Sequence, residues 1–170
     1  WQTYRNEEYG FEVKYPGDLF TEKQRSENLP PAYNEKILGV ALIHSVPVKH
    51  CGLSGLAEHC TPETENIRIG FFPTDKDFSE VEGPNRTFFG GNIQDFPVLG
   101  KNGITFLAGA EGEGIYYYLL PLSTNRALII TRSYVDERDL LNYQGVAGFI
   151  GFTEQEKLFN QILSTFKFIE

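Results

Sequence analysis

The chain has no methionine among its 170 residues, not even at position 1. We therefore expect a processed or trimmed chain, from which a secretory signal, a lipoprotein leader or a tag was removed. It also has no apolar run of about 18 residues, the length that a membrane-spanning helix needs. The sequence thus predicts contact with a membrane only through an N-terminal anchor that was removed or is missing.

Positive charge is scarce. Lys and Arg number 15 against 23 Asp and Glu, which leaves a formal net charge of −8. Because contacts to phosphates require a basic stripe, this balance argues against nucleic acid as a partner. Apolar residues make up 41% of the chain and aromatic residues 14%, enough for a packed core. This length and composition predict one folded domain over residues 1–170.

The chain has only two cysteines, Cys51 and Cys60, in the loop 47–62. We predict a disulfide between them, because a bridge that closes so short a loop stabilises the fold by about 3 kcal/mol. A zinc site that also uses His50 and His59 is a second interpretation, although adjacent ligands in an extended chain point apart. Two free thiols are a third interpretation. Mass measurement with and without reductant, together with a zinc assay, distinguishes these outcomes.

A disulfide favours an oxidising compartment. We therefore expect an extracytoplasmic protein, either secreted or anchored at the cell surface. A protein of the bacterial envelope is then the expected kind of partner.

Apolar residues recur along the chain with the spacing of β-strands. Alternation and dense apolar runs predict strands over residues 11–15, 36–46, 65–73, 104–110, 115–122 and 127–134. The last three follow one another with short turns, so we expect an antiparallel meander. The run 36–46 is apolar on both sides, which is typical of a strand covered on both faces.

The end of the chain predicts an amphipathic helix. Thr153 is expected to cap it, with Glu156 completing a capping box. Its apolar face comprises Leu158, Phe159, Ile162, Leu163 and Phe166. A shorter helix is predicted over 75–81, and 83–103 is predicted to be a long irregular connection. These elements predict an α+β fold, a central and mostly antiparallel sheet packed by the C-terminal helix.

Three segments carry a family resemblance. Residues 9–16 (YGFEVKYP), the meander with the ending 159–168 (FNQILSTFKF), and the middle segment 51–60 (CGLSGLAEHC) are similar to PsbP-like exported bacterial proteins, which are often lipoproteins. The resemblance implies an α/β/α sandwich. The family includes photosystem accessory proteins and, more distantly, Ran-binding proteins, so it implies a scaffold that binds partners and no shared enzyme activity.

Tyr116 and Tyr118 are the candidate binding residues. Alternation along a strand places them on one face and Tyr117 on the other. If the C-terminal helix covers only the face of Tyr117, the two tyrosines form an exposed aromatic patch, and such patches often mark binding surfaces. The other interpretation is that loops or the N-terminal segment cover them.

The sequence contains no nucleophile paired with a base, so we predict no catalytic residue, metal or cofactor. The functional prediction is a non-enzymatic binding or accessory module of the bacterial cell envelope. Two alternatives stay open. One is a hydrolase or metal-dependent enzyme with its site in 83–103, and the other is a protein that binds a small molecule or a metal.

Overall fold

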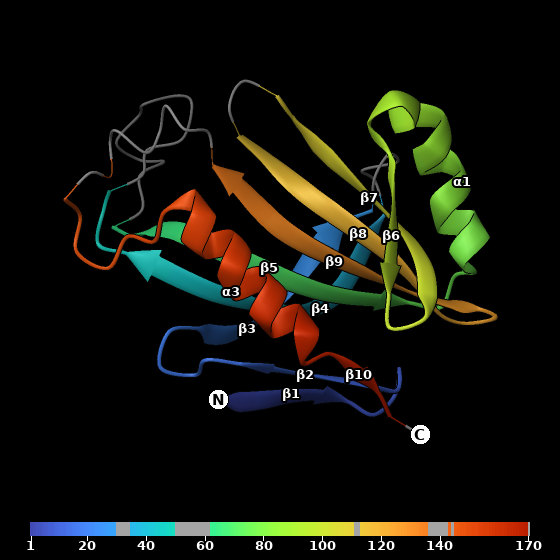
Figure 1. Ribbon diagram of the computed structural model, residues 1–170, viewed down its shortest axis with the longest axis horizontal. Coiled ribbons are helices and arrows are strands. Elements are labelled where there is room, and N and C mark those ends of the chain that lie inside the picture. The colour runs from blue at the N-terminus through green and yellow to red at the C-terminus, as the bar shows by residue number, and fades with distance from the viewer. Residues whose placement is uncertain (30–34, 50–61, 111–112, 136–142, 144, 170) are drawn as a thin grey trace.

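A computed structural model of the protein describes residues 1–29, 35–49, 62–110, 113–135, 143 and 145–169. Within these residues the fold is α+β, with a seven-stranded and a three-stranded antiparallel sheet and two α-helices (Figure 1). The elements in chain order are β1 Gln2–Asn6, β2 Phe11–Tyr15, β3 Thr21–Asn28, β4 Lys36–Val46, β5 Thr64–Thr74, α1 Phe78–Phe89, the 3-10 turn η2 Gly90–Asn92, β6 Gln94–Val98, β7 Lys101–Ala110, β8 Glu113–Ser123, β9 Arg126–Val135, α3 Phe152–Ser164 and β10 Lys167–Phe168.

The large sheet has the strand order β3-β4-β5-β9-β8-β7-β6, and the small sheet has the order β1-β2-β10. The predicted strand 36–46 is confirmed as β4, which lies inside the sheet between β3 and β5. The predicted meander is also confirmed, because β7 pairs with β8 and β8 pairs with β9, both antiparallel.

Each face of the large sheet carries an apolar core cluster. Along β8, Tyr118 and Leu120 join one core cluster, whereas Tyr117 and Leu119 join the other. Helix α3 and the small sheet pack on the face of Tyr118, and α1 packs on the opposite face through Val81. The central sheet therefore has a helix on each side.

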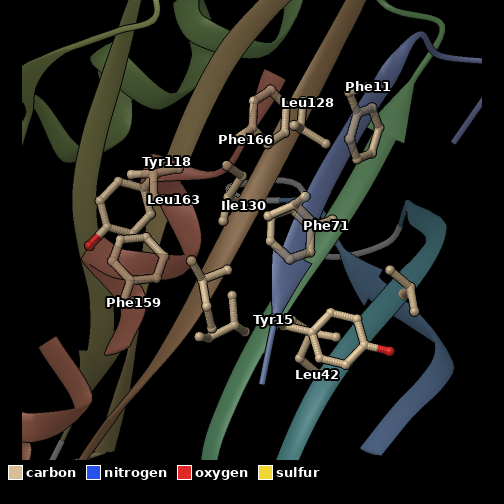
Figure 2. Close-up of a cluster of buried hydrophobic side chains, with 14 of the residues drawn as sticks. Phe11, Tyr15, Leu42, Phe71, Tyr118, Leu128, Ile130, Phe159, Leu163 and Phe166 are labelled. Carbon is tan, nitrogen blue, oxygen red and sulfur yellow. The ribbon is translucent and has the colours of Figure 1, made fainter. Parts of the chain in front are cut away.

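The two ends of the chain meet in the small sheet, where β10 pairs with β2. Phe11 of β2 is fully buried, and its ring stacks on Phe166 at a centroid distance of 5.3 Å. The ring centroid of Phe11 also lies 6.5 Å from that of Phe71 in the large sheet. Figure 2 shows these rings within the apolar cluster, which joins the first and last strands to the central sheet.

The predicted cap of α3 is wrong. Gly151 is the N-cap residue, and Thr153 lies inside the first turn. Glu156 does not reach back to the cap, and its carboxylate lies 3.5 Å from Arg132 Nη2 instead. The helix begins earlier because side chains of the sheet hold the backbone of Ile150 just before it.

The prediction of an irregular connection over 83–103 is also wrong. Helix α1 continues to Phe89 through an internal proline, Pro84, and the strand β6 follows. Packing explains the difference, because Val81 and Asn85 are buried on the sheet side of α1 and Phe89 stacks on Phe106 of β7 at 4.6 Å. These contacts outweigh the hydrogen bond that a proline removes from a helix.

The apolar face predicted for α3 is confirmed, since Phe159, Ile162 and Leu163 are buried and Leu158 is partly buried. Ile162 is fully enclosed. We expect Ile162→Ala to lower the free energy of unfolding by roughly 2 to 5 kcal/mol, as truncations in well-packed cores do. Denaturant titration measures this change. Gln161→Ala, on the exposed side of the same turn, is the control, and an equal midpoint for both variants would contradict the packing.

Glu12 is the centre of a row of ion pairs across the small sheet. Arg5 on β1 and Lys167 on β10 are its neighbours in the two ladders. Lys167 Nζ lies 2.7 Å from one carboxylate oxygen, and Arg5 Nη1 lies 3.5 Å from the other. The hydrogen bond from Lys167 is the main reason that the pKa of the Glu12 carboxyl is lowered. The row thus links the first and last strands of the protein.

A lowered pKa has a definite effect on acid stability. The charged carboxylate of Glu12 stabilises the native state above the ordinary pKa of glutamate, and this contribution disappears as the pH falls through the lower native value. We expect the wild type to lose more stability between neutral and acid pH than Glu12→Gln. Denaturant midpoints at several pH values measure the difference. Glu7→Gln, at an 81% exposed side chain that pairs with Arg5, is the control and should keep the wild-type pH dependence.

Candidate binding site at Arg132

Arg132 is a charged residue at an inward-facing position of β9. Leu128 and Ile130 precede it on the same face, within the cluster that α3 covers. In the sheet it lies between Ile69 of β5 and Tyr116 of β8. Its side chain is only 5% exposed. A guanidinium enclosed to this degree is costly unless its charge and its N–H groups find partners.

Aromatic rings surround the guanidinium. Its central carbon lies 4.7 Å from the ring centroid of Tyr116, 5.3 Å from that of Phe159 and 5.5 Å from that of Phe152. All three distances are within the range of about 6 Å for cation–π attraction. Tyr116 belongs to β8 and the two phenylalanines to α3, so the site forms only when α3 packs on the sheet.

Glu156 of α3 supplies the carboxylate that faces Arg132. Its Oε1 atom is 3.5 Å from Nη2, whereas a strong charged hydrogen bond measures about 2.7 to 2.9 Å. The Glu156 side chain is 48% exposed, so water competes for it. The Arg132 Nε atom is enclosed and has no hydrogen-bond partner. The cation is therefore held by rings, by a hydrogen bond to Tyr118 and by one long ion pair, while its Nε donor stays unpaired.

The structure brings Tyr116 and Tyr118, the predicted binding residues, to this site. Tyr118 is only 8% exposed, because its ring packs on Phe159 of α3 at 4.9 Å and on Phe96 of β6 at 4.8 Å (Figure 2). Burial raises the pKa of Tyr118, and the nearby Arg132 charge partly opposes that rise. Of the two interpretations, burial holds for Tyr118, although the covering element is α3, which packs on the face of Tyr118 rather than on that of Tyr117. The binding role of the pair stays a prediction.

The segment before α3 is positioned by buried side chains of the sheet and helix. The Ile150 N–H donates to Asn66 Oδ1 at 2.8 Å, and the Asn66 amide donates back to the Ile150 carbonyl at 3.1 Å. Gln155 Nε2 donates to the same carbonyl at 2.8 Å. His44 Nε2 lies 2.8 Å from the carbonyl oxygen of Gly148, whose φ of 80° favours glycine. These bonds fix where α3 starts and so where its rings meet Arg132.

Comparison with known proteins finds a distant structural similarity and no family. No protein-family model matches the chain, and no curated protein matches it. A crystal structure of a protein from Bacteroides thetaiotaomicron is similar to it, with a TM-score of 0.48 and 10% sequence identity. The match covers 94% of this chain and 45% of the Bacteroides chain, so this chain spans less than half the length of that protein.

The predicted disulfide falls outside the described residues, as do Cys51, Cys60 and the two adjacent histidines. In the described part of the chain, no group of three or more His, Cys, Asp or Glu side chains is arranged to hold a metal ion. A search of that same part finds no helix long and apolar enough to cross a membrane.

Sequence reasoning missed Arg132. The signal was present, because an arginine interrupts the apolar series of β9 at a position that alternation directs inward with Leu128 and Ile130. Its aromatic neighbours on α3 are separated from it by about twenty residues or more, and no local pattern predicts that they meet. A charged residue at a core register indicates that specific partners surround it, because an unpaired buried charge is costly.

The enclosed charge generates a stability prediction. Replacing a buried ion pair by an apolar side chain of similar volume is often neutral or stabilising, and Glu156 is exposed enough to be hydrated alone. We expect Arg132→Met to leave the free energy of unfolding unchanged or to raise it by about 1 to 4 kcal/mol. Denaturant titration is the measurement. Arg86→Met, which removes a half-exposed arginine from α1, is the control and should cost at most about 1 kcal/mol.

A loss of about 3 kcal/mol or more in Arg132→Met would contradict this expectation. It would mean that Arg132 stabilises the fold. An unchanged or higher stability means that the fold does not depend on the arginine, which is compatible with a role in ligand recognition.

Proposed function

We propose that the protein is a non-enzymatic binding or accessory module of the bacterial cell envelope, with a PsbP-like sandwich as its scaffold. The resemblance of residues 9–16 and 159–168 to that family supports the scaffold. The central sheet with a helix on each face is compatible with it. The proposed location is extracytoplasmic, supported by the predicted disulfide, and the net charge of −8 supports a partner other than nucleic acid.

One observation carries the binding role, namely the enclosed and incompletely paired guanidinium of Arg132. Arginine stays protonated at any physiological pH, so it holds and orients an anionic group rather than transferring a proton. Its neighbour Tyr116 is only partly buried, and tyrosine is frequent in recognition surfaces. The site is thus built for recognition.

The alternative of an enzyme site in 83–103 gains no support from the local structure. This segment forms the second half of α1, the turn η2, β6 and the start of β7. Its described contacts include ring packing, surface ion pairs and hydrogen bonds from Asn85 and Thr87 to carbonyl groups of α1. The same Arg132 site also favours the alternative of a protein that binds a small molecule. The two functions differ in the ligand, which is a small molecule in one case and an envelope protein in the other.

Capture of an envelope partner tests the proposal. Immobilised protein is cross-linked in a bacterial envelope extract, and specific partners are identified for the wild type and the variants. We expect Arg132→Met and Tyr116→Ser to lose these partners, because both remove groups of the site, while Arg86→Met keeps them. Both site variants must show the wild-type circular dichroism spectrum.

Screens for activity test the rival function. Esterase, phosphatase, peptidase and glycosidase substrates should show no turnover above background with the wild-type protein. A reproducible turnover that is lost when one carboxylate or His44 is replaced would contradict the proposal and support the enzyme alternative. Capture that is equal in Arg132→Met and the wild type would contradict the site.

A further inference from the structure

The Arg132–Glu156 pair is long for a cation that is so enclosed. Contacts of about this length occur elsewhere in the molecule, but at arginines that water reaches, such as Arg5 with Glu12 and Arg86 with Asp95. The pairs Arg86–Glu82 and Lys167–Glu12 each close to 2.7 Å, although water competes for their half-exposed cations. Arg132 is 5% exposed, yet its contact with Glu156 measures 3.5 Å. A desolvated cation gains more from a close anion than a hydrated one does. The long contact is therefore not the best pair that this guanidinium is able to make.

One donor group of Arg132 remains unused. Glu156 is contacted through Nη2 and a further hydrogen bond goes to Tyr118, but the enclosed Nε has no hydrogen-bond partner. A guanidinium has five N–H groups in a planar fork, which matches the two oxygens of a carboxylate. Since Glu156 is 48% exposed and lies on the solvent side of the pair, it is able to swing away from Arg132 without leaving a buried charge.

From this geometry we propose that Arg132 binds the carboxylate group of a ligand, which takes the place of Glu156. The inference rests on the proposed binding function and specifies the chemistry that this function recognises. The ligand carboxylate forms two hydrogen bonds with the guanidinium, and the released Glu156 side chain enters water. Glu156 thus acts as an internal competitor that keeps the empty site neutral.

The surroundings favour a carboxylate over a phosphate. One cation balances one negative charge, and the neighbouring Glu156 and Glu154, together with the net charge of −8, oppose a dianion. Tyr116 and Phe152 flank the guanidinium and are only partly buried, which suits an apolar or aromatic body that carries the acid. Helix α3 begins at Phe152, and the partial positive charge of its N-terminus adds to the attraction.

The carboxylate has two possible sources, a free small molecule or the C-terminus of a protein chain. Benzoate represents the first and N-acetylphenylalanine the second, and benzamide and N-acetylphenylalanine amide are their uncharged controls. Each compound is titrated into the ¹⁵N-labelled full chain, and the Arg132 Nε–H resonance is followed by NMR. We expect saturable shifts with at least one of the two acids and none with the amides.

Two matched substitutions on α3 test the competition. Glu156→Gln and Glu154→Gln each remove one negative charge from neighbouring positions of the same helix, but only Glu156 faces Arg132. We expect Glu156→Gln to tighten binding of the acid about three- to tenfold, as the loss of a competing ion pair implies. Glu154→Gln should change the affinity for the acid less than about twofold. Arg132→Met lacks the Nε–H probe, so its titration is followed through the Tyr116 ring resonances, and we expect no shift.

The outcomes separate the inference from the proposed function. No saturable shift with either acid in Glu156→Gln overturns the inference, as does equal tightening by Glu154→Gln. If carboxylates fail while capture of an envelope partner still requires Arg132, the binding function stands and its chemistry is different. If carboxylates bind while partner capture does not require Arg132, the site is a small-molecule site and the envelope-module function is wrong.

Discussion

Coverage of one face of the large sheet by α3 and the small sheet is the constraint on which the other features of the structure depend. That face carries residues from β4, β5, β8 and β9, and it is closed by segments from the two ends of the chain. Phe11 and Phe166 stack at 5.3 Å where these ends meet. Phe159 of α3 covers Tyr118, with the ring centroids 4.9 Å apart. Without this closure the apolar face would be exposed to water, and Arg132 would be a surface residue.

Hydrogen bonds from side chains to distant backbone groups set the position of this cover. Thr165 Oγ1 accepts from the Lys14 N–H at 2.7 Å and ties the end of α3 to β2, as Asn66 ties its beginning to β5. Arg126 donates to the Glu8 carbonyl and so holds the β1–β2 turn against the start of β9. Each bond satisfies backbone groups that have no ladder partner, which is why irregular segments have defined places here.

Strands that show one hydrophobic period are predictable from the sequence, and strands that do not are missed. The run 36–46 and the meander have dense or alternating apolar residues, and their bounds agree with β4 and β7–β9 to within a few residues. Strand β3 was missed because its sequence TEKQRSEN is polar throughout, as suits an exposed edge strand. The second half of α1 was missed because Gly83 and Pro84 signal a break, which packing against β7 and β8 overrides.

By itself the sequence determined the fold class, the apolar face of the last helix, and the placement of Tyr116 and Tyr118 on one face of their strand with Tyr117 on the other. These features follow from periods of 2.0 and 3.6 residues along the chain. Only the tertiary structure decided which face α3 covers. Alternation places Tyr116 and Tyr118 together, but it does not say whether water or a helix lies above them. The same holds for Arg132, whose charge is plain in the sequence. Its enclosure by Phe152 and Phe159 depends on the docking of a helix that the strand's own residues do not specify.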